Sequence, residues 1–222
     1  MATTTTEKGY RGMGMEGPIA RWYARITRPS LPEFQALARR VADAVPPAGS
    51  VLEVAPGPGY FAIELAKLGG RHVTGLDISR TFVEIARHNA LEAGVDVEFQ
   101  QGNVASMPLP QNTFDYLVCR AAFKNFSEPG TALGEMHRVL KPGGRALIID
   151  LRRDVAPDAI RREVENLKLG PINAFIVRQI FRFMLIKRAY TKGGFRQLIA
   201  DSPFRGGDIQ ESLVGVEITL TK

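Results

Sequence analysis

The feature that most constrains the fold is an alternation of short apolar runs with helical segments across residues 51–150, with glycine or proline at the joints. The apolar runs predict strands at 51–55, 72–76, 95–100, 114–119 and 145–150. The intervening segments predict helices at 61–68, 79–93 and 131–140. Strands and helices that take turns in this way build a parallel sheet with helices on both faces. The sequence therefore predicts an α/β fold with a doubly wound sheet.

The flanking segments divide the chain into four expected parts. Residues 1–30 are expected to form a partly disordered N-terminal flap with one short helix, and residues 31–150 form the core. The run Ser30-Leu31-Pro32-Glu33 predicts a helix start, with a serine cap, an early proline and a glutamate three residues after the serine. Residues 151–190 are helical in pattern and are expected to cap the core. Residues 191–222 are expected to add a helix and two short strands.

Composition places the chain among globular proteins. Hydrophobic residues make up 45% and charged residues 23% of its 222 residues, which excludes disorder for the bulk of the chain. No apolar run reaches the roughly 18 residues that span a bilayer. The polar N-terminus has no apolar signal core, so a cytoplasmic location is expected. Cys119 is the only cysteine and the three histidines are scattered, so neither a disulfide nor a metal site is expected.

Positive charge is concentrated toward the C-terminus. The net charge is +6, and residues 151–222 carry 13 basic against 8 acidic residues. Residues 174–186 are apolar at ten of thirteen positions and include Arg178 and Arg182, which are four apart and share a helix face. We expect a lid over a ligand, in which these arginines meet a negative group. The alternatives are a packed cap helix and an interfacial helix that contacts a membrane.

Residues 51–60, with the sequence VLEVAPGPGY, combine a strand, a glycine turn and a helix start. Gly57 and Gly59 allow a sharp turn and the close approach of a ligand, and the helix that follows offers free N–H groups to a negative group. Gly57, Gly59 and Ala62 also fit the dinucleotide-binding fingerprint, with Asp77 at about the distance of its ribose-binding acid. This stretch alone leaves a cofactor loop and an ordinary strand–helix turn open.

Two acidic residues strengthen the case for a cofactor site. Asp77 ends the second predicted strand, at the sheet edge where ligands bind, so its carboxylate can accept both hydroxyls of a ribose. Otherwise Asp77, or Ser79 in its place, caps the next helix. Glu53 stands inside an apolar strand, and a buried carboxylate needs donors or loses its charge. We expect its partners among the N–H groups of the glycine loop or in a ligand ammonium group.

The ordered motifs resemble those of class I S-adenosylmethionine-dependent methyltransferases. Residues 53–59 (EVAPGPG) look like the family's E/D-x-G-x-G-x-G loop, with Ala55 in place of the first glycine. Residues 76–79 (LDIS) resemble its second motif, and residues 99–109 its GDAxxLPF segment, with Asn103 where aspartate is usual. Further matches, at the fourth and fifth strands, lie in residues 112–116 and 139–144. The similarity is nearest to the small-molecule branch that includes quinone-ring C-methyltransferases.

This resemblance implies a Rossmann-like doubly wound sheet of seven strands with an antiparallel last strand and a helical cap. It implies S-adenosyl-L-methionine as the cofactor and a small molecule as the methyl acceptor. Because residues 151–190 are apolar in the centre and basic throughout, we expect this acceptor to be aromatic or anionic. It also argues against a nicotinamide dehydrogenase, which requires neither Glu53 before the loop nor the LKPGG turn at residues 140–144.

The resemblance implies roles for single residues near the methionine end of the cofactor. The backbone at Ala55 and Gly57 would hold this end, with Gly59 in the same loop. Glu53 would lie near the cofactor's ammonium group, directly or through water. The backbone at Arg120, just past the fourth strand, would touch the methionine part.

At the adenosyl end, Asp77 would take the ribose hydroxyls. Ile78 and Val104 would sandwich the adenine, and Asn103 would bond its amino edge. Tyr23, with the tryptophan before it, would form an N-terminal flap over the cofactor.

Methyl transfer from a sulfonium is an in-line displacement, which the protein assists mainly by proximity and orientation. A catalytic base is therefore not required, and Tyr23 and Lys124 are the candidates for one. Lys124 stands where many relatives carry a histidine pair, and it is also a candidate for orienting an anionic substrate.

Two other functions remain open. One is a protein that binds the cofactor for different chemistry, and the other is an enzyme that modifies RNA or protein. Nucleic acid is not expected as a partner, because the sequence has no appended nucleic-acid module, whereas peripheral membrane contact stays open.

Overall fold

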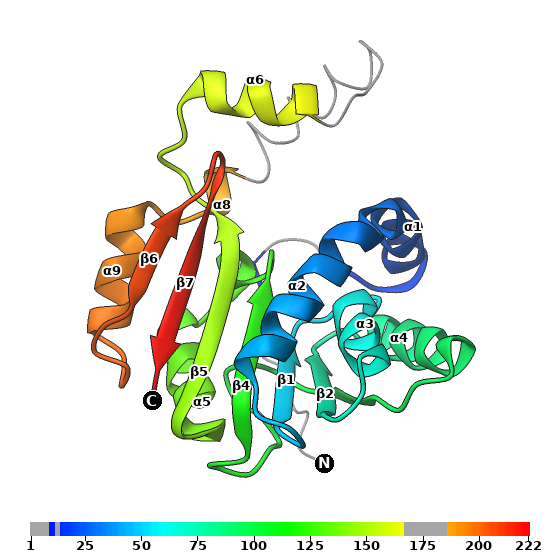
Figure 1. Cartoon of the computed structure of the whole chain (residues 1–222). Coiled ribbons are helices and arrows are strands. Elements are labelled where there is room, and N and C mark those ends of the chain that lie inside the picture. The colour runs from blue at the N-terminus through cyan, green and yellow to red at the C-terminus, as the bar shows by residue number, and fades with distance from the viewer. Residues whose placement is uncertain (1–8, 12–13, 167–185) are drawn as a thin grey trace, which may run out of the picture.

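The computed structural model describes residues 9–11, 14–166 and 186–222. Within these residues the centre of the molecule is a sheet of seven strands in the order β3-β2-β1-β4-β5-β7-β6 (Figure 1). The strands are β1 (Ser50–Val54), β2 (His72–Asp77), β3 (Glu98–Gln101), β4 (Phe114–Arg120), β5 (Leu140–Leu151), β6 (Asp208–Glu211) and β7 (Gly215–Thr221). Strands β1 to β5 pair in parallel, and β7 runs antiparallel to both β5 and β6. The expected fold class is confirmed.

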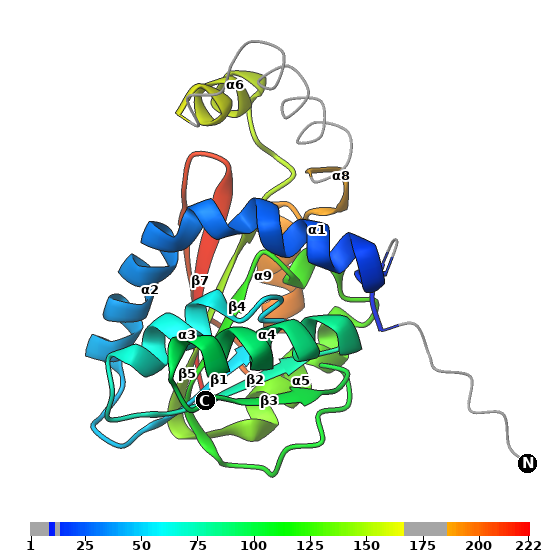
Figure 2. The same ribbon diagram turned by 90° about the vertical axis from the view of Figure 1, so that its right-hand side faces the viewer.

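Helices cover both faces of the sheet (Figures 1 and 2). One layer holds α2 (Leu31–Ala44), α3 (Tyr60–Lys67) and α4 (Arg80–Ala93), and α5 (Pro129–Val139) and α9 (Lys192–Ala200) lie on the other face. Helix α1 (Gly17–Thr27) runs above the carboxyl ends of the strands and continues through η1 (Arg28–Ser30) into α2. Two hydrophobic clusters, one on each face, fill the space between these layers.

The strand order fixes the position of the site. Strand β1 lies between β2 and β4, and the helix that follows β1 covers one face whereas the helix that follows β4 covers the other. The chain thus reverses its winding between β1 and β4, which is the switch point of an open α/β sheet. Ligands of such sheets bind in the crevice at the carboxyl ends of the strands on either side of this point.

Three local predictions differ from the structure. Strand β5 begins at Leu140 rather than at residue 145, because Leu140 pairs with Phe114 and the ladder resumes after a register shift. Strand β3 is shorter than predicted and begins at Glu98. Ser30 caps nothing with its side chain, because it ends a 3-10 turn with ψ near 11° instead of the extended conformation of a cap. Glu33, the expected capping partner, instead bonds Arg120.

The segment after β5 leaves the sheet at its upper end (Figure 1). It contains α6 (Pro157–Asn166) before the described chain resumes at α8 (Ile186–Arg188). Arg178 and Arg182 lie outside the described residues. In the part of the chain that the structure describes, no helix combines the length and the apolar character required to cross a membrane.

Candidate active site

The loop between β1 and α3 forms one wall of the cleft at the switch point. Ala55, Gly57 and Gly59 all have positive φ, at 55°, 55° and 79°. A Cβ on Gly59 would lie 2.7 Å from Phe99 and 2.9 Å from Ala86, so only glycine fits there, whereas Gly57 faces open space. The loop therefore combines a tight turn with backbone that a ligand can approach.

Asp77 connects this loop to the end of β2. Its buried carboxylate accepts the N–H of Gly57 at Oδ2 (2.9 Å) and the N–H of Ser79 at Oδ1 (2.9 Å). Burial raises the pKa of Asp77 to about 6, and the bonds from Ser79 and Gly57 oppose that rise. An ionised carboxylate can accept about four hydrogen bonds, so both oxygens keep capacity for ligand hydroxyls. Ser79, not Asp77, caps α4, by accepting the N–H of Phe82 at 3.0 Å.

Glu53 lies beneath the same loop and stabilises the start of α3. Gly59, at the N-cap of α3, has no side chain to satisfy the free N–H groups of the first turn. The N–H of Ala62 donates instead to Glu53 Oε2 at 3.1 Å. Burial raises the pKa of Glu53 to about 8, which the bond from Ala62 and the positive charge of Arg120 partly oppose. Glu53 is therefore a buried acid that a positive group in the cleft would ionise.

The expected adenine residues lie together beyond Asp77. Val104 is buried, Ile78 and Asn103 are half-buried, and Asn103 Oδ1 accepts the N–H of Ala105 at 3.0 Å. Gly9 lies directly against two of them: a Cβ on Gly9 would be 2.6 Å from both Asn103 Nδ2 and Ile78 Cδ1. The N-terminal segment thus reaches the corner of the cleft that the resemblance assigns to adenine.

Residues 9–11 and 14–17 form a strap over this corner, which the sequence did not predict. The N–H of Arg11 donates to the carbonyl of Asn125 at 2.6 Å, which connects residues 9–11 to the loop after β4. Glu16 accepts the N–H groups of Arg80 and Thr81, both at 3.0 Å, at the start of α4. Its carboxylate therefore satisfies donors that the first turn of a helix leaves free. The sequence pattern gave no indication of this cap, because Glu16 lies far in sequence from α4, the helix that it caps.

Helix α1 contacts α4 and runs above the carboxyl ends of the strands (Figure 2). Tyr23 packs edge-on against Phe82 with ring centroids 5.8 Å apart, and burial raises the pKa of its phenol. Trp22 on the same helix is 58% exposed. The two neighbours therefore differ: Tyr23 faces the protein, and Trp22 faces solvent.

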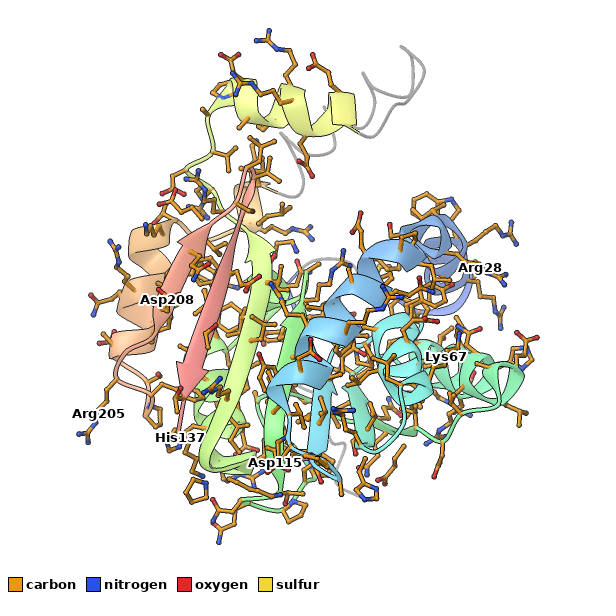
Figure 3. All side chains as sticks on the ribbon, in the orientation of Figure 1. Arg28, Lys67, Asp115, His137, Arg205 and Asp208 are labelled. Atoms are coloured by element: carbon orange, nitrogen blue, oxygen red, sulfur yellow. The ribbon has the colours of Figure 1, made fainter. Side chains whose placement is uncertain are left out.

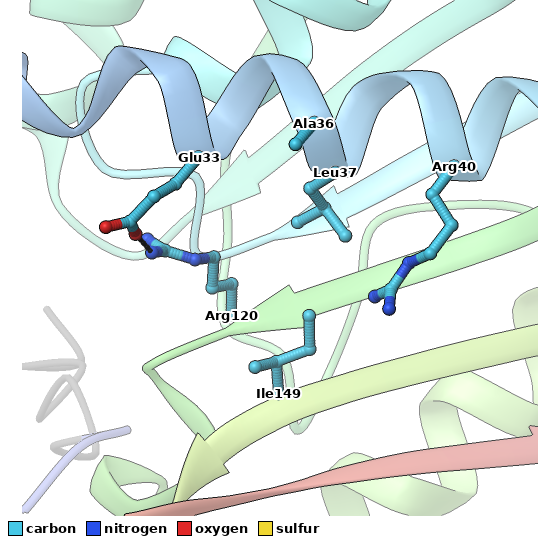
Figure 4. A pocket seen from close by; sticks show the side chains of 6 residues that line it. All are labelled: Glu33, Ala36, Leu37, Arg40, Arg120 and Ile149. Carbon is cyan, nitrogen blue, oxygen red and sulfur yellow. Dashed lines mark hydrogen bonds and ion pairs between the residues drawn. The ribbon is translucent and has the colours of Figure 1, made fainter. Parts of the chain in front are cut away.

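Arg120 is the last residue of β4, the strand that pairs with β1. Its guanidinium bonds Glu33 at 2.7 Å (Figure 4). The guanidinium also lies 4.5 Å from the ring centroid of Phe34. Beside it a groove of 360 Å³ opens between α2 and the sheet. Its lining residues are Glu33, Ala36, Leu37, Arg40, Arg120 and Ile149. The groove is apolar in its middle and charged at both ends.

Lys124 was a candidate for a base and for orienting an anionic substrate, but in the structure its ammonium group is buried and bonded within the protein. It is 3% exposed, and its ammonium bonds Asp150 Oδ1 at 2.8 Å and the carbonyl of Ala121 at 2.6 Å. Cys119 is buried at the end of β4, and burial raises the pKa of its thiol far above the ordinary range, so it is a core residue. No group of metal-ligating side chains occurs among the described residues.

The glycine loop after β1 and the Asp77 carboxylate at the end of β2 thus lie together at the switch point of a Rossmann-like sheet. Residues 52–148 match the family described as a methyltransferase domain. This match runs from β1 into β5, so that segment of the chain is similar to a methyltransferase domain.

Known proteins are similar to this chain in sequence over part of its length and in fold over most of it. A demethylmenaquinone methyltransferase of Deinococcus radiodurans is 36% identical over 101 residues, which are 45% of this chain and 42% of that protein. The match thus covers less than half of the relative. A solved structure of a candidate S-adenosylmethionine-dependent methyltransferase of Methanococcus maripaludis has a TM-score of 0.72, with 23% identity over 96% of this chain and 95% of that one. The cyclase SpnF has the same fold, with a TM-score of 0.55 and 21% identity over 85% of this chain and 80% of SpnF.

Proposed function

We propose that this protein transfers the methyl group of S-adenosylmethionine to a small quinone-type molecule with a hydroxylated aromatic ring. The observation that carries the proposal is the Asp77 carboxylate, which is bonded to the loop after β1 and retains capacity for two ribose hydroxyls. The similarity to demethylmenaquinone methyltransferases favours an aromatic, quinone-type acceptor over a macromolecule.

The residues present fit the cofactor. Gly57 offers backbone with no side chain in the way, and Asp77 matches a ribose. Glu53 lies beneath the loop as a partner for the ammonium group, and Ile78 and Val104 supply apolar surface for adenine. The carbonyl of Ala55 and the backbone at Arg120 would bind the methionine part.

The sulfonium supplies the electrophilic methyl group, so the protein's task is to orient the two reactants and exclude water. Tyr23 and α1 would cover the cofactor from above, consistent with residues 1–30 acting as a flap. Residues 151–190 leave β5 at the same end of the sheet, and we propose that they cap the acceptor. Tyr23 is the remaining candidate for a base, because the Lys124 ammonium is held by Asp150 and Ala121.

The acceptor site would border the loop after β4. The groove beside Arg120 offers apolar lining at Leu37 and Ile149 next to a guanidinium, which suits an aromatic body with an anionic oxygen. Arg178 and Arg182 stay predicted partners for that oxygen. Peripheral contact with a membrane also remains a prediction.

A second function is favoured by one finding. The cyclase SpnF shares this fold, and its name describes chemistry other than methyl transfer. The chain could in the same way bind S-adenosylmethionine without using its methyl group.

Transfer of a deuterated methyl group distinguishes the two functions. The purified protein is incubated with methyl-deuterated S-adenosylmethionine and a panel of hydroquinones, phenols and aromatic carboxylates, and products are detected by mass. A product that is three mass units heavier than the unlabelled methyl adduct, because three deuterium atoms replace three hydrogens, supports the proposal. Cofactor binding without any labelled product across the panel would favour the second function. The Asp77→Asn variant is the control, because it should lose labelled product together with cofactor affinity.

A further inference from the structure

Two alanines occupy equivalent positions on either side of the switch point. Ala55 is the first residue after β1 and Ala121 the first after β4, with φ of 55° and 57°. Each donates its N–H to the neighbouring strand: Ala55 to the carbonyl of Leu76 at 2.8 Å, and Ala121 to that of Ile149 at 2.7 Å. Strands β1 and β4 are paired in parallel, so the two residues follow neighbouring strands at the same end of the sheet.

The conformation of Ala121 needs an explanation. A residue with a Cβ is sterically disfavoured at positive φ, and such residues persist where the surroundings hold them, often at functional sites. The carbonyl of Ala121 accepts the Lys124 ammonium at 2.6 Å, so both polar groups of its backbone are bonded. Lys124 therefore fixes the orientation of this residue from below the cleft.

The Lys124 ammonium is itself held in place by Asp150 at the end of β5. The two side chains are 4% and 0% exposed and are 2.8 Å apart. The Asp150 carboxylate also accepts the backbone N–H groups of Lys124, at 2.8 Å, and of Leu151, at 2.7 Å. A buried ion pair with its hydrogen bonds satisfied is costly to break and holds a single geometry. The pair thus connects β4, its loop and β5.

We propose that Lys124 and Asp150 are positioning residues for the cofactor. They hold Ala121 in its left-handed conformation, and so set the backbone wall that faces the Gly57 loop across the cleft. This inference rests on the proposed function, because the wall would contact the methionine part and the reacting sulfonium. Neither side chain touches the reactants.

The test separates this role from a contribution to stability. Lys124→Met alone leaves the Asp150 carboxylate buried without its partner and should lower the melting temperature strongly. The double variant Lys124→Met/Asp150→Asn removes both charges and should recover most of that loss. We expect the double variant to bind S-adenosylhomocysteine at least tenfold more weakly than wild type in calorimetry. Adding Ala121→Gly to it should restore much of the affinity, because glycine adopts positive φ without steric cost.

Lys141→Met is the matched control. Lys141, near the start of β5, bonds Asp115, near the start of β4, at 2.8 Å. This ion pair lies at the opposite end of the two strands from Lys124 and Asp150, and Figure 3 labels Asp115 there. Its affinity for S-adenosylhomocysteine should equal that of wild type. A folded double variant whose dissociation constant stays within twofold of wild type overturns the inference. If the double variant does not fold, Ala121→Val in the wild-type background must weaken binding, and unchanged binding then overturns it. Wild-type protein that binds neither form of the cofactor would instead sink the proposed function and this inference with it.

Discussion

Glu53 gives the most direct test of the cofactor's orientation. Burial raises its pKa to about 8. At pH 7 roughly nine-tenths of the free protein would therefore carry a proton on this side chain. The carboxyl lies below the loop that is proposed to hold the methionine end, so the cofactor's ammonium group would approach it. A nearby positive charge favours the ionised form of an acid.

Binding of S-adenosylhomocysteine should thus release a proton from Glu53. If the ammonium lowers its pKa by about two units, the interaction is worth roughly 2.7 kcal/mol. The release at pH 7 should then be roughly 0.8 proton per molecule, and at pH 9 close to zero, because Glu53 is already ionised there. The Glu53→Gln variant has no such proton to lose.

Calorimetry in buffers with different ionisation enthalpies measures this release. The observed binding enthalpy should differ between phosphate and Tris at pH 7 for wild type, and should agree between them for Glu53→Gln. Equal enthalpies in both buffers for the wild-type protein would show that no proton leaves. That result would remove Glu53 from the ammonium site or show that it is already ionised.

The same pKa has a consequence for stability without cofactor. The folded pKa of Glu53 is above its ordinary value of 4.5, so the folded state holds the proton more tightly than the unfolded state. This contribution to stability is complete below pH 4.5 and is lost as the pH rises toward 8, at roughly 1.4 kcal/mol per pH unit. Asp77, whose pKa burial raises to about 6, acts in the same direction below that pH. Urea unfolding from pH 5 to 8 should show a smaller loss of stability in Glu53→Gln than in wild type.

Three further predictions follow from the same cleft. Asp77→Ala should weaken binding of S-adenosylmethionine by about 1.5–3 kcal/mol, the scale of hydrogen bonds to a charged group, and an unchanged calorimetric affinity would exclude Asp77 from the site. Trp22 fluorescence should change on saturation with cofactor, since the single tryptophan lies on the covering helix; a constant spectrum would count against the flap. Glu16→Gln should speed dissociation of S-adenosylhomocysteine in stopped-flow measurements, because the strap loses a charged cap at α4, and an unaltered rate would leave the strap without a role in exchange.

The core of the fold was predictable because its signals are local. Apolar runs of strand length, glycine and proline at the joints and the acid at the end of β2 each report on a few neighbouring residues. Ser79 capped α4 as one of the two expected alternatives. The start of β5 was missed because residues 140–144 read as a turn, and only pairing of Leu140 with Phe114 makes the segment extended. Pairing between distant residues has no signature in a local pattern.

The site was predictable to the extent that it depends on one loop. Glu53 was expected to meet N–H groups of the glycine loop or a ligand ammonium group, whereas its partner is the N–H of Ala62, on the helix that follows that loop. Lys124 could not be interpreted correctly, because its environment is set by Asp150, which lies 26 residues away on another strand. The local sequence around Lys124 does not identify the buried carboxylate that its ammonium group bonds. The ion pair of Glu33 with Arg120, 87 residues apart, was hidden for the same reason.

The strap of residues 9–11 and 14–17 lies against residues that the sequence motifs assign to the cofactor. Gly9 contacts Ile78 and Asn103, the residues that the family resemblance assigns to adenine, and the contact leaves no space for a side chain. Adenine and Gly9 cannot occupy the same surface, so cofactor binding requires residues 9–11 to move or to settle over the ring. Both ends of the strap are fixed by hydrogen bonds, one at Asn125 and one at the start of α4. If adenine binds at these residues, entry of the cofactor would break or shift at least one of these ends, and we expect Glu16 to affect how fast the product leaves even though it is remote from the reacting methyl group.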